Sequence, residues 1–132
     1  MIQENPKLKA AFANTNTIEY GGFKIVKSGD MPWDKARVYV DGQQIILNMT
    51  ETRSLALLVA YRGEFVPKEA HGFDNARNKE VRIAGVINSI KKSAKNQLGL
   101  DIYSRFVTFY PRKKDFPDWD SYAARLGNYK II

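Results

Sequence analysis

The spacing of hydrophobic residues changes part-way along the chain, from short strand-like runs to helical spacing. In the first part, residues 23–26, 37–40 and 43–47 have the branched and aromatic composition of β-strands. The last two runs flank Asp41 and Gly42, a dipeptide that favours a type I′ turn because glycine accepts a positive φ at low cost. We therefore expect an antiparallel hairpin at this position.

A first helix is predicted over residues 49–62. Asn48 and Glu51 have the spacing of a capping box, in which the Asn side chain accepts from the Glu51 amide and the Glu51 carboxylate accepts from the Asn48 amide. Apolar residues then recur at helical spacing until Gly63, a residue that commonly ends helices. A second, short helix is expected over residues 67–71, because proline suits the first turn of a helix.

The third helix, predicted over residues 79–97, has two distinct sides. Ile83, Ile87, Ile90 and Ala94 fall within about 60° of one another when successive residues are placed at 100° intervals. This stripe is expected to face the core. The opposite side and its flanks carry Arg82, Gly85, Asn88, Ser89, Lys92, Lys95 and Asn96.

Beyond the third helix, the pattern predicts a β-strand region over residues 102–110 and an amphipathic helix over residues 117–126. Trp119, Tyr122 and Leu126 recur at helical spacing in that last segment. These three residues either cover the core or form a dimer or partner interface, and the pattern leaves both alternatives open.

Charge is segregated along the chain, which changes the functional picture. The 132 residues include 21 Lys and Arg against 14 Asp and Glu, a formal net charge of +7. Residues 77–114 contain ten basic and two acidic residues, a net charge of +8, which leaves about −1 for the rest. Such segregation is typical of a face that binds a polyanion.

The outer side of the third helix has the chemistry of a nucleic-acid contact surface. No carboxylate follows Glu80 in this helix. Arg and Lys suit the acceptors of guanine, Asn suits adenine, and the small Gly85 permits a close approach. An ordinary basic surface helix is the alternative. The candidate DNA-binding residues from this helix are Lys79, Arg82, Gly85, Asn88, Ser89, Lys92, Lys95 and Asn96.

Two stretches of the sequence resemble the winged-helix effector domain of OmpR/PhoB-type response regulators. Residues 46–69 contain Ile-Leu-Asn-Met-Thr-Glu and Gly-Glu-Phe-Val-Pro-Lys-Glu, which are similar to the starts of that family's first and second helices. Residues 87–92, Ile-Asn-Ser-Ile-Lys-Lys, resemble the Ile-Ser-x-Leu-Arg-x-Lys pattern of its recognition helix. The likeness covers about residues 18–110.

The resemblance implies that the third helix lies in the major groove and that a C-terminal hairpin, the wing, contacts the DNA backbone or minor groove. Carried over residue by residue, it makes Arg82, Ser89 and Lys92 base or phosphate contacts and Arg105 a wing contact. The usual Gly-x-Gly-Tyr of the wing is replaced here by Val-Thr-Phe-Tyr at residues 107–110. No receiver domain is expected ahead of the effector domain.

The expected fold is therefore α+β: a winged helix-turn-helix with an N-terminal antiparallel sheet, three core helices, a C-terminal β hairpin as the wing, and an added C-terminal helix. We expect a flexible N-terminal arm over residues 1–17, which are polar and rich in Asn and Thr. The winged-helix domain is expected over residues 18–112 and a helical extension over residues 113–132.

The predicted function is transcription regulation through binding of double-stranded DNA, by a cytoplasmic, nucleoid-associated protein that is not an enzyme. RNA polymerase, another protein or a second copy of the chain are the further partners considered. No cofactor or metal is expected, since His71 is the only histidine and there is no cysteine. The longest apolar stretch, residues 55–61, is far shorter than the ~20 residues of a membrane-spanning helix.

Two alternative functions stay open. One is a winged-helix protein-interaction module that binds, for example, a polymerase subunit. The other is a non-specific DNA-binding protein of the nucleoid type, which would bind random and selected duplexes equally well.

Overall fold

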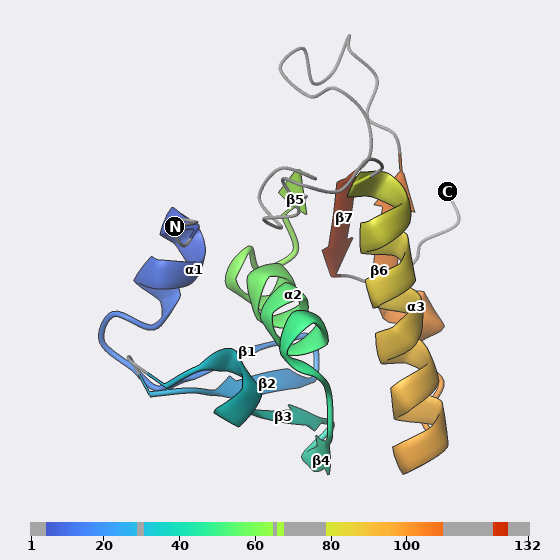
Figure 1. Cartoon of the computed structure of the whole chain (residues 1–132), viewed down its shortest axis with the longest axis horizontal. Helices are drawn as coiled ribbons and strands as arrows, with labels where there is room; N and C mark the ends of the chain where they lie inside the picture. Colours follow the sequence, from blue (N-terminus) through green and yellow to red (C-terminus); the bar gives the residue numbers. More distant parts are fainter. Residues whose placement is uncertain (1–4, 29–30, 65, 68–78, 110–122, 127–132) are drawn as a thin grey trace, which may run out of the picture.

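Two antiparallel sheets and three α-helices make up the part of the chain described by this computed structural model, which comprises residues 5–28, 31–64, 66–67, 79–109 and 123–126. Figure 1 shows α2 in the centre, with α1 on one side, α3 on the other and the first sheet beneath it. The elements in chain order are α1 (Pro6–Ala11), β1 (Thr17–Tyr20), β2 (Phe23–Val26), the 3-10 turn η1 (Trp33–Lys35), β3 (Arg37–Val40), β4 (Gln43–Ile45), α2 (Met49–Ala60), β5 (Val66–Pro67), α3 (Lys79–Leu98), the 3-10 turn η3 (Tyr103–Arg105), β6 (Phe106–Phe109) and β7 (Ala123–Leu126).

The first sheet has the strand order β1-β2-β3-β4, and each strand is antiparallel to its neighbour. The expected hairpin is confirmed: Val40 pairs with Gln43 across a two-residue turn. Both turn residues have positive φ, 51° at Asp41 and 84° at Gly42, as a type I′ turn requires. Alternate residues of β2 and β3 are buried, so this sheet turns one face to the core.

Helix α2 covers the buried face of the first sheet and begins at the expected capping box. The Asn48 side chain accepts from the Glu51 amide at 2.8 Å, and the Glu51 carboxylate accepts from the Asn48 amide at 2.9 Å. The helix then buries an unbroken run, residues 54–59, because the sheet, α1 and α3 all pack against it. It ends at Ala60, two residues before the expected end, and Gly63 has a φ of +85° in the turn that follows.

Helix α3 is held to the first sheet at its C-terminal end. The helix closes with Gly99 at a φ of +68°, whose amide donates to the Lys95 carbonyl at 3.0 Å. The Gln97 side chain bonds both backbone groups of Ile46, accepting from its amide and donating to its carbonyl at 2.8 Å each. The side-chain amide of Gln97 therefore pairs with the backbone N–H and C=O of Ile46, directly after the edge strand β4. Unpaired backbone groups at a sheet edge can pair with a strand of another molecule.

The second sheet has the strand order β5-β7-β6, with β7 antiparallel to both neighbours. The expected helix over residues 117–126 is wrong for Ala123–Leu126, which form β7 and pair with Phe106–Phe109. Ala-Ala-Arg-Leu has a high helix propensity, but pairing on both sides with β5 and β6 overrides it. Residues 110–122 lie outside the described residues.

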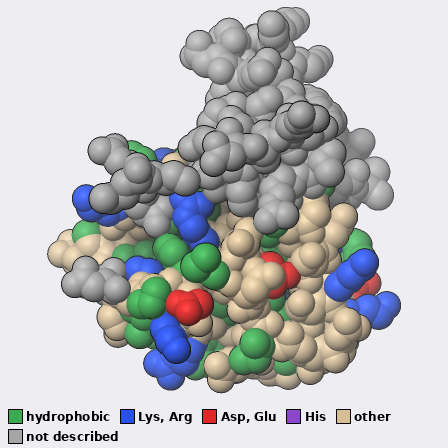
Figure 2. Space-filling model, viewed as in Figure 1, with side chains coloured by type: hydrophobic (Ala, Val, Ile, Leu, Met, Phe, Trp, Pro, Cys, Tyr) green, Lys and Arg blue, Asp and Glu red, His purple; other side chains and the backbone are tan. Residues whose placement is uncertain are grey.

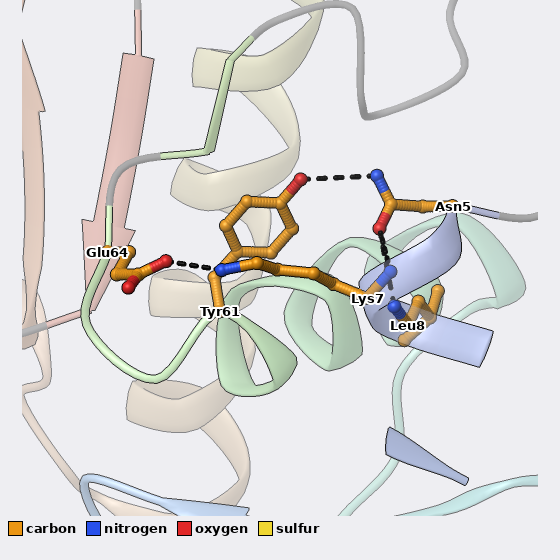
Figure 3. Close-up of polar contacts among 5 residues, drawn as sticks. All are labelled: Asn5, Lys7, Leu8, Tyr61 and Glu64. Carbon is orange, nitrogen blue, oxygen red and sulfur yellow. Dashed lines mark hydrogen bonds and ion pairs between the residues drawn. The ribbon is translucent and has the colours of Figure 1, made fainter. Parts of the chain in front are cut away.

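The N-terminal segment also differs from the expected flexible arm, because residues 6–11 form α1 and Thr17 begins β1. Leu8 is 1 % exposed, so this helix adds an apolar side chain to the core. The Asn5 side chain accepts from the amides of Lys7 and Leu8 and donates to the Tyr61 hydroxyl at 3.2 Å (Figure 3). Lys7 forms an ion pair with Glu64, as Figure 3 also shows.

The expected short helix does not begin at Pro67, because Pro67 lies in β5. Residues 68–71 are outside the described part of the chain. None of the described helices is long and apolar enough to cross a membrane.

Candidate nucleic-acid interface

Helix α3 has the two-sided character that the sequence predicts. Val86 and Ile87 are 8 % and 2 % exposed, and Ile90 and Ala94 are fully buried. These side chains belong to the same hydrophobic core as α2 and the first sheet. The apolar stripe of the helix is therefore confirmed for these residues, while the side chain of Ile83 lies outside the described part.

The opposite side of α3 is exposed along its described length. The candidate residues that the structure places at the surface are Gly85, Asn88, Ser89, Lys92, Lys95 and Asn96. Lys79 and Arg82 belong to the same helix, but their side chains are not among those described. In Figure 2, Lys and Arg side chains lie at the right-hand edge of the molecule, where α3 runs in Figure 1, with an acidic side chain beside them.

The electrostatics of this surface favour anions. From residue 81 to the end of α3 the sequence contains no Asp or Glu, whereas Lys91, Lys92 and Lys95 follow one another within five positions. Lys92 and Lys95 are exposed. Exposed ammonium groups with no carboxylate on the same face of a helix are free to neutralise phosphates.

Gly85 lies on the exposed side of α3 and leaves open space around its α-carbon. A Cβ at this position would meet no atom of the described residues within 4 Å, and the residue has no positive φ. Neither packing nor backbone conformation therefore requires glycine here. Glycine in the middle of a helix costs roughly 0.5–1 kcal/mol relative to alanine, and the described residues do not account for this cost.

Lys91 lies at the border between the exposed and buried sides, where it makes an aromatic contact that the sequence pattern did not predict. Its ammonium is 4.6 Å from the ring centroid of Tyr103 and 5.6 Å from that of Phe106. Partial burial lowers the pKa of Lys91, and the charge of Asp101 opposes that effect. Tyr103 remains 51 % exposed on η3, beside α3. Only the fold brings η3 beside the middle of α3.

Arg105, the expected wing contact, lies outside the hairpin strands. It ends η3, and β6 begins at the next residue. Its two terminal nitrogens donate to the two carboxylate oxygens of Asp41, at 2.8 Å and 2.6 Å. This hydrogen bonding lowers the pKa of Asp41 and raises the pKa of Arg105. Because the guanidinium is already paired with Asp41, we leave Arg105 out of the interface.

The expected dimer or partner interface falls almost wholly outside the described residues. Trp119 and Tyr122 lie in residues 110–122, and Leu126 is in β7 opposite Phe106, with its side chain undescribed. The idea of one helical face that carries all three residues is wrong, since Leu126 is in a strand. An interface role for these residues stays a prediction.

Neither a search for metal-binding groups in the described residues nor a comparison with known proteins identifies a further site. The described residues contain no group of three or more His, Cys, Asp or Glu side chains placed to hold a metal ion. His71 is outside the described part. No protein-family model matches the chain, and no curated protein matches it significantly in sequence.

Proposed function

We propose that the protein is a winged-helix protein that binds double-stranded DNA and acts in transcription control, with the exposed side of α3 in the major groove. The observation that carries the proposal is the sidedness of α3. One side is in the core, and the other exposes amide, hydroxyl and ammonium groups with no carboxylate among them after Glu80.

The order of the elements supports the proposal. A four-stranded sheet precedes α2 and the short strand β5 follows it. The long α3 then leads into the antiparallel strands β6 and β7, of which β7 also pairs with β5. A recognition helix followed by a hairpin is the arrangement that the OmpR/PhoB-type resemblance implies. In that arrangement the β6–β7 hairpin is the wing.

The dimensions of α3 suit the major groove. Its 20 residues make a rod of about 30 Å, and a helix with its side chains is about 10–12 Å across. The major groove of B-DNA is about 12 Å wide. We place Asn88 and Ser89 toward base edges and Lys92 and Lys95 toward phosphates, because amides and hydroxyls can discriminate bases whereas ammonium groups act as point charges.

The segment that joins β6 to β7, residues 110–122, has no net charge, because a basic triplet is balanced by Asp115, Asp118 and Asp120. Its sequence contains Arg112, Lys113 and Lys114 in succession. The two strands that it connects are antiparallel neighbours in the second sheet. In the proposed function, the basic triplet, and not the segment as a whole, would add phosphate contacts to those of α3.

Salt dependence of duplex binding tests the assignment of α3. On B-DNA, each phosphate that a protein neutralises adds about 0.9 to the steepness of the plot of log K against log salt. We expect Lys92→Ala and Lys95→Ala each to make this slope shallower by about one. Lys35→Ala is the matched control, because Lys35 is exposed but belongs to η1, which packs against α2. Equal slopes in all three variants would contradict the assignment.

Selection of bound fragments from random duplexes separates the proposed function from its alternatives. A recovered consensus sequence supports specific recognition, with Asn88→Ala or Ser89→Ala changing the preferred bases. Binding without a consensus indicates a non-specific nucleoid-type protein. Absence of duplex binding even at low salt contradicts a DNA-binding function and leaves the protein-interaction module.

A further inference from the structure

Three turns that are distant in sequence meet at the start of β6. Gly22 is in the turn between β1 and β2, Asp41 is in the turn between β3 and β4, and Arg105 ends η3. The Asp41 amide donates to the Gly22 carbonyl at 2.8 Å. The Asp41 carboxylate accepts the two parallel hydrogen bonds from Arg105, at 2.8 Å and 2.6 Å. Two parallel bonds fix direction as well as distance.

Gly22 leaves the room that this ion pair occupies. A Cβ at Gly22 would lie 2.5 Å from Asp41 Oδ1 and 2.9 Å from Arg105 Nη1, and φ at this position is +85°. Distances this short require an atom to shift, so any larger residue would displace the pair. The turn between β1 and β2 is therefore shaped to admit the guanidinium of Arg105.

Aromatic rings connect Arg105 to β6 and α3. The guanidinium carbon of Arg105 is 5.8 Å from the ring centroid of Phe23, and that ring is 5.6 Å from the ring of Phe106. Phe106 is the first residue of β6, and the Lys91 ammonium of α3 lies 5.6 Å from its ring centroid. The ion pair thus connects the first sheet to the point where β6 passes α3.

We propose that the Asp41–Arg105 pair is a positioning contact that fixes the β6–β7 hairpin relative to α3 and thereby supports duplex binding without touching DNA. This inference rests on the proposed function. Asp41 and Arg105 are 64 positions apart, so the contact exists only in the folded chain. On this view Asp41, although acidic, increases affinity for a polyanion.

The proposal is tested by whether Asp41→Asn raises or lowers the affinity for duplex DNA. Asn tolerates the positive φ of Asp41 and keeps one acceptor oxygen, so the variant loses the charge and one of the parallel bonds while the turn is retained. Removing a carboxylate ordinarily strengthens binding to DNA. We expect Asp41→Asn to weaken duplex binding instead, on the order of threefold to tenfold. Asp34→Asn, on an exposed residue of η1, is the matched control and is expected to leave affinity unchanged or slightly higher.

A direct DNA contact by Arg105 predicts the opposite result. If Arg105 bound phosphate, Asp41→Asn would release its guanidinium and raise the affinity, an outcome that would overturn the proposal. Under the proposal, the double variant Asp41→Asn/Arg105→Ala loses no more affinity than Arg105→Ala alone. Arg105→Lys, which keeps the charge but not the paired bonds, restores only part of the loss.

Amide hydrogen exchange in the DNA-free protein gives a measurement that does not depend on DNA binding. We expect Asp41→Asn to increase exchange in β6 while β2, which is held by strands on both sides, changes little. If the unmodified protein binds no duplex, the proposed function fails but the exchange result still decides whether the pair positions β6. Unchanged exchange in β6 would overturn the positioning role.

Discussion

Replacing Gly85 by alanine should stabilise the protein and weaken its binding to DNA. The added methyl group enters open space on the exposed side of α3, since no atom in the described part of the chain lies within 4 Å of the Cβ position. Glycine has a lower helix propensity than alanine because it loses more backbone freedom on folding. We therefore expect Gly85→Ala to raise the free energy of unfolding by roughly 0.5–1 kcal/mol.

The same methyl group has the opposite effect on the proposed complex. If α3 lies in the major groove with Gly85 facing the duplex, the methyl group fills space that the DNA needs. An extra methyl group in a well-packed contact typically costs about 1–3 kcal/mol. A cost of about 1.4 kcal/mol is a tenfold loss of affinity, so we expect a loss on the order of tenfold.

Urea unfolding and duplex titration of the same protein samples measure the two effects. Gly99→Ala is the matched control, because its Cβ position is equally open but its φ is +68°. Alanine in that left-handed conformation costs about 1–2 kcal/mol, so the control is destabilised. A destabilised Gly85→Ala variant would refute the exposed helical position of Gly85. A stabilised variant with unchanged affinity would refute its contact with DNA.

Two further predictions concern folding. Asn48→Ala removes the side-chain acceptor of the capping box and should lower the free energy of unfolding by about 1 kcal/mol, measured in urea; an unchanged midpoint and slope would contradict the role of Asn48 as the cap of α2. The pKa of Asp41 is lowered because Arg105 donates hydrogen bonds to its carboxylate. The ionised carboxylate therefore stabilises the fold fully above the unfolded-state pKa of about 3.9, and this stabilisation is lost as the pH falls through the lowered folded-state pKa. We expect the stability difference between the native protein and Asp41→Asn to be within about 1 kcal/mol at neutral pH, since the pair is partly exposed. The difference should shrink as the pH falls below about 4; a difference that grows on acidification would contradict this prediction.

Features set by neighbouring residues could be predicted from the sequence. The Asn48–Glu51 capping box and the Asp41-Gly42 turn depend on residues only a few positions apart, and both are present. The buried side of α3 also follows from local spacing, because a helix places residues three and four positions apart on one side. At Ile87 and Ile90 the prediction and the structure agree.

Features set by distant partners could not be predicted. The segment at Ala123–Leu126 becomes a strand because β5 and β6 are available on both sides, although its composition favours a helix. Residues 6–11 lack a strong apolar pattern, yet Leu8 packs in the core and Asn5 caps the helix. The pairing of Arg105 with Asp41 could not be predicted either, because the two residues are 64 positions apart; the wing contact that the resemblance implies for Arg105 stays a prediction.

Site-directed crosslinking tests most directly whether the exposed side of α3 faces DNA. The sequence contains no cysteine, so one engineered cysteine gives a single attachment point for a photoactivatable crosslinker. Ser89→Cys places it on the exposed side of α3, and Gln44→Cys places it at an exposed position of β4 in the first sheet. We predict that bound duplex crosslinks to residue 89 and not to residue 44. Crosslinks from residue 44 alone, or equally from both positions, would contradict the central proposal.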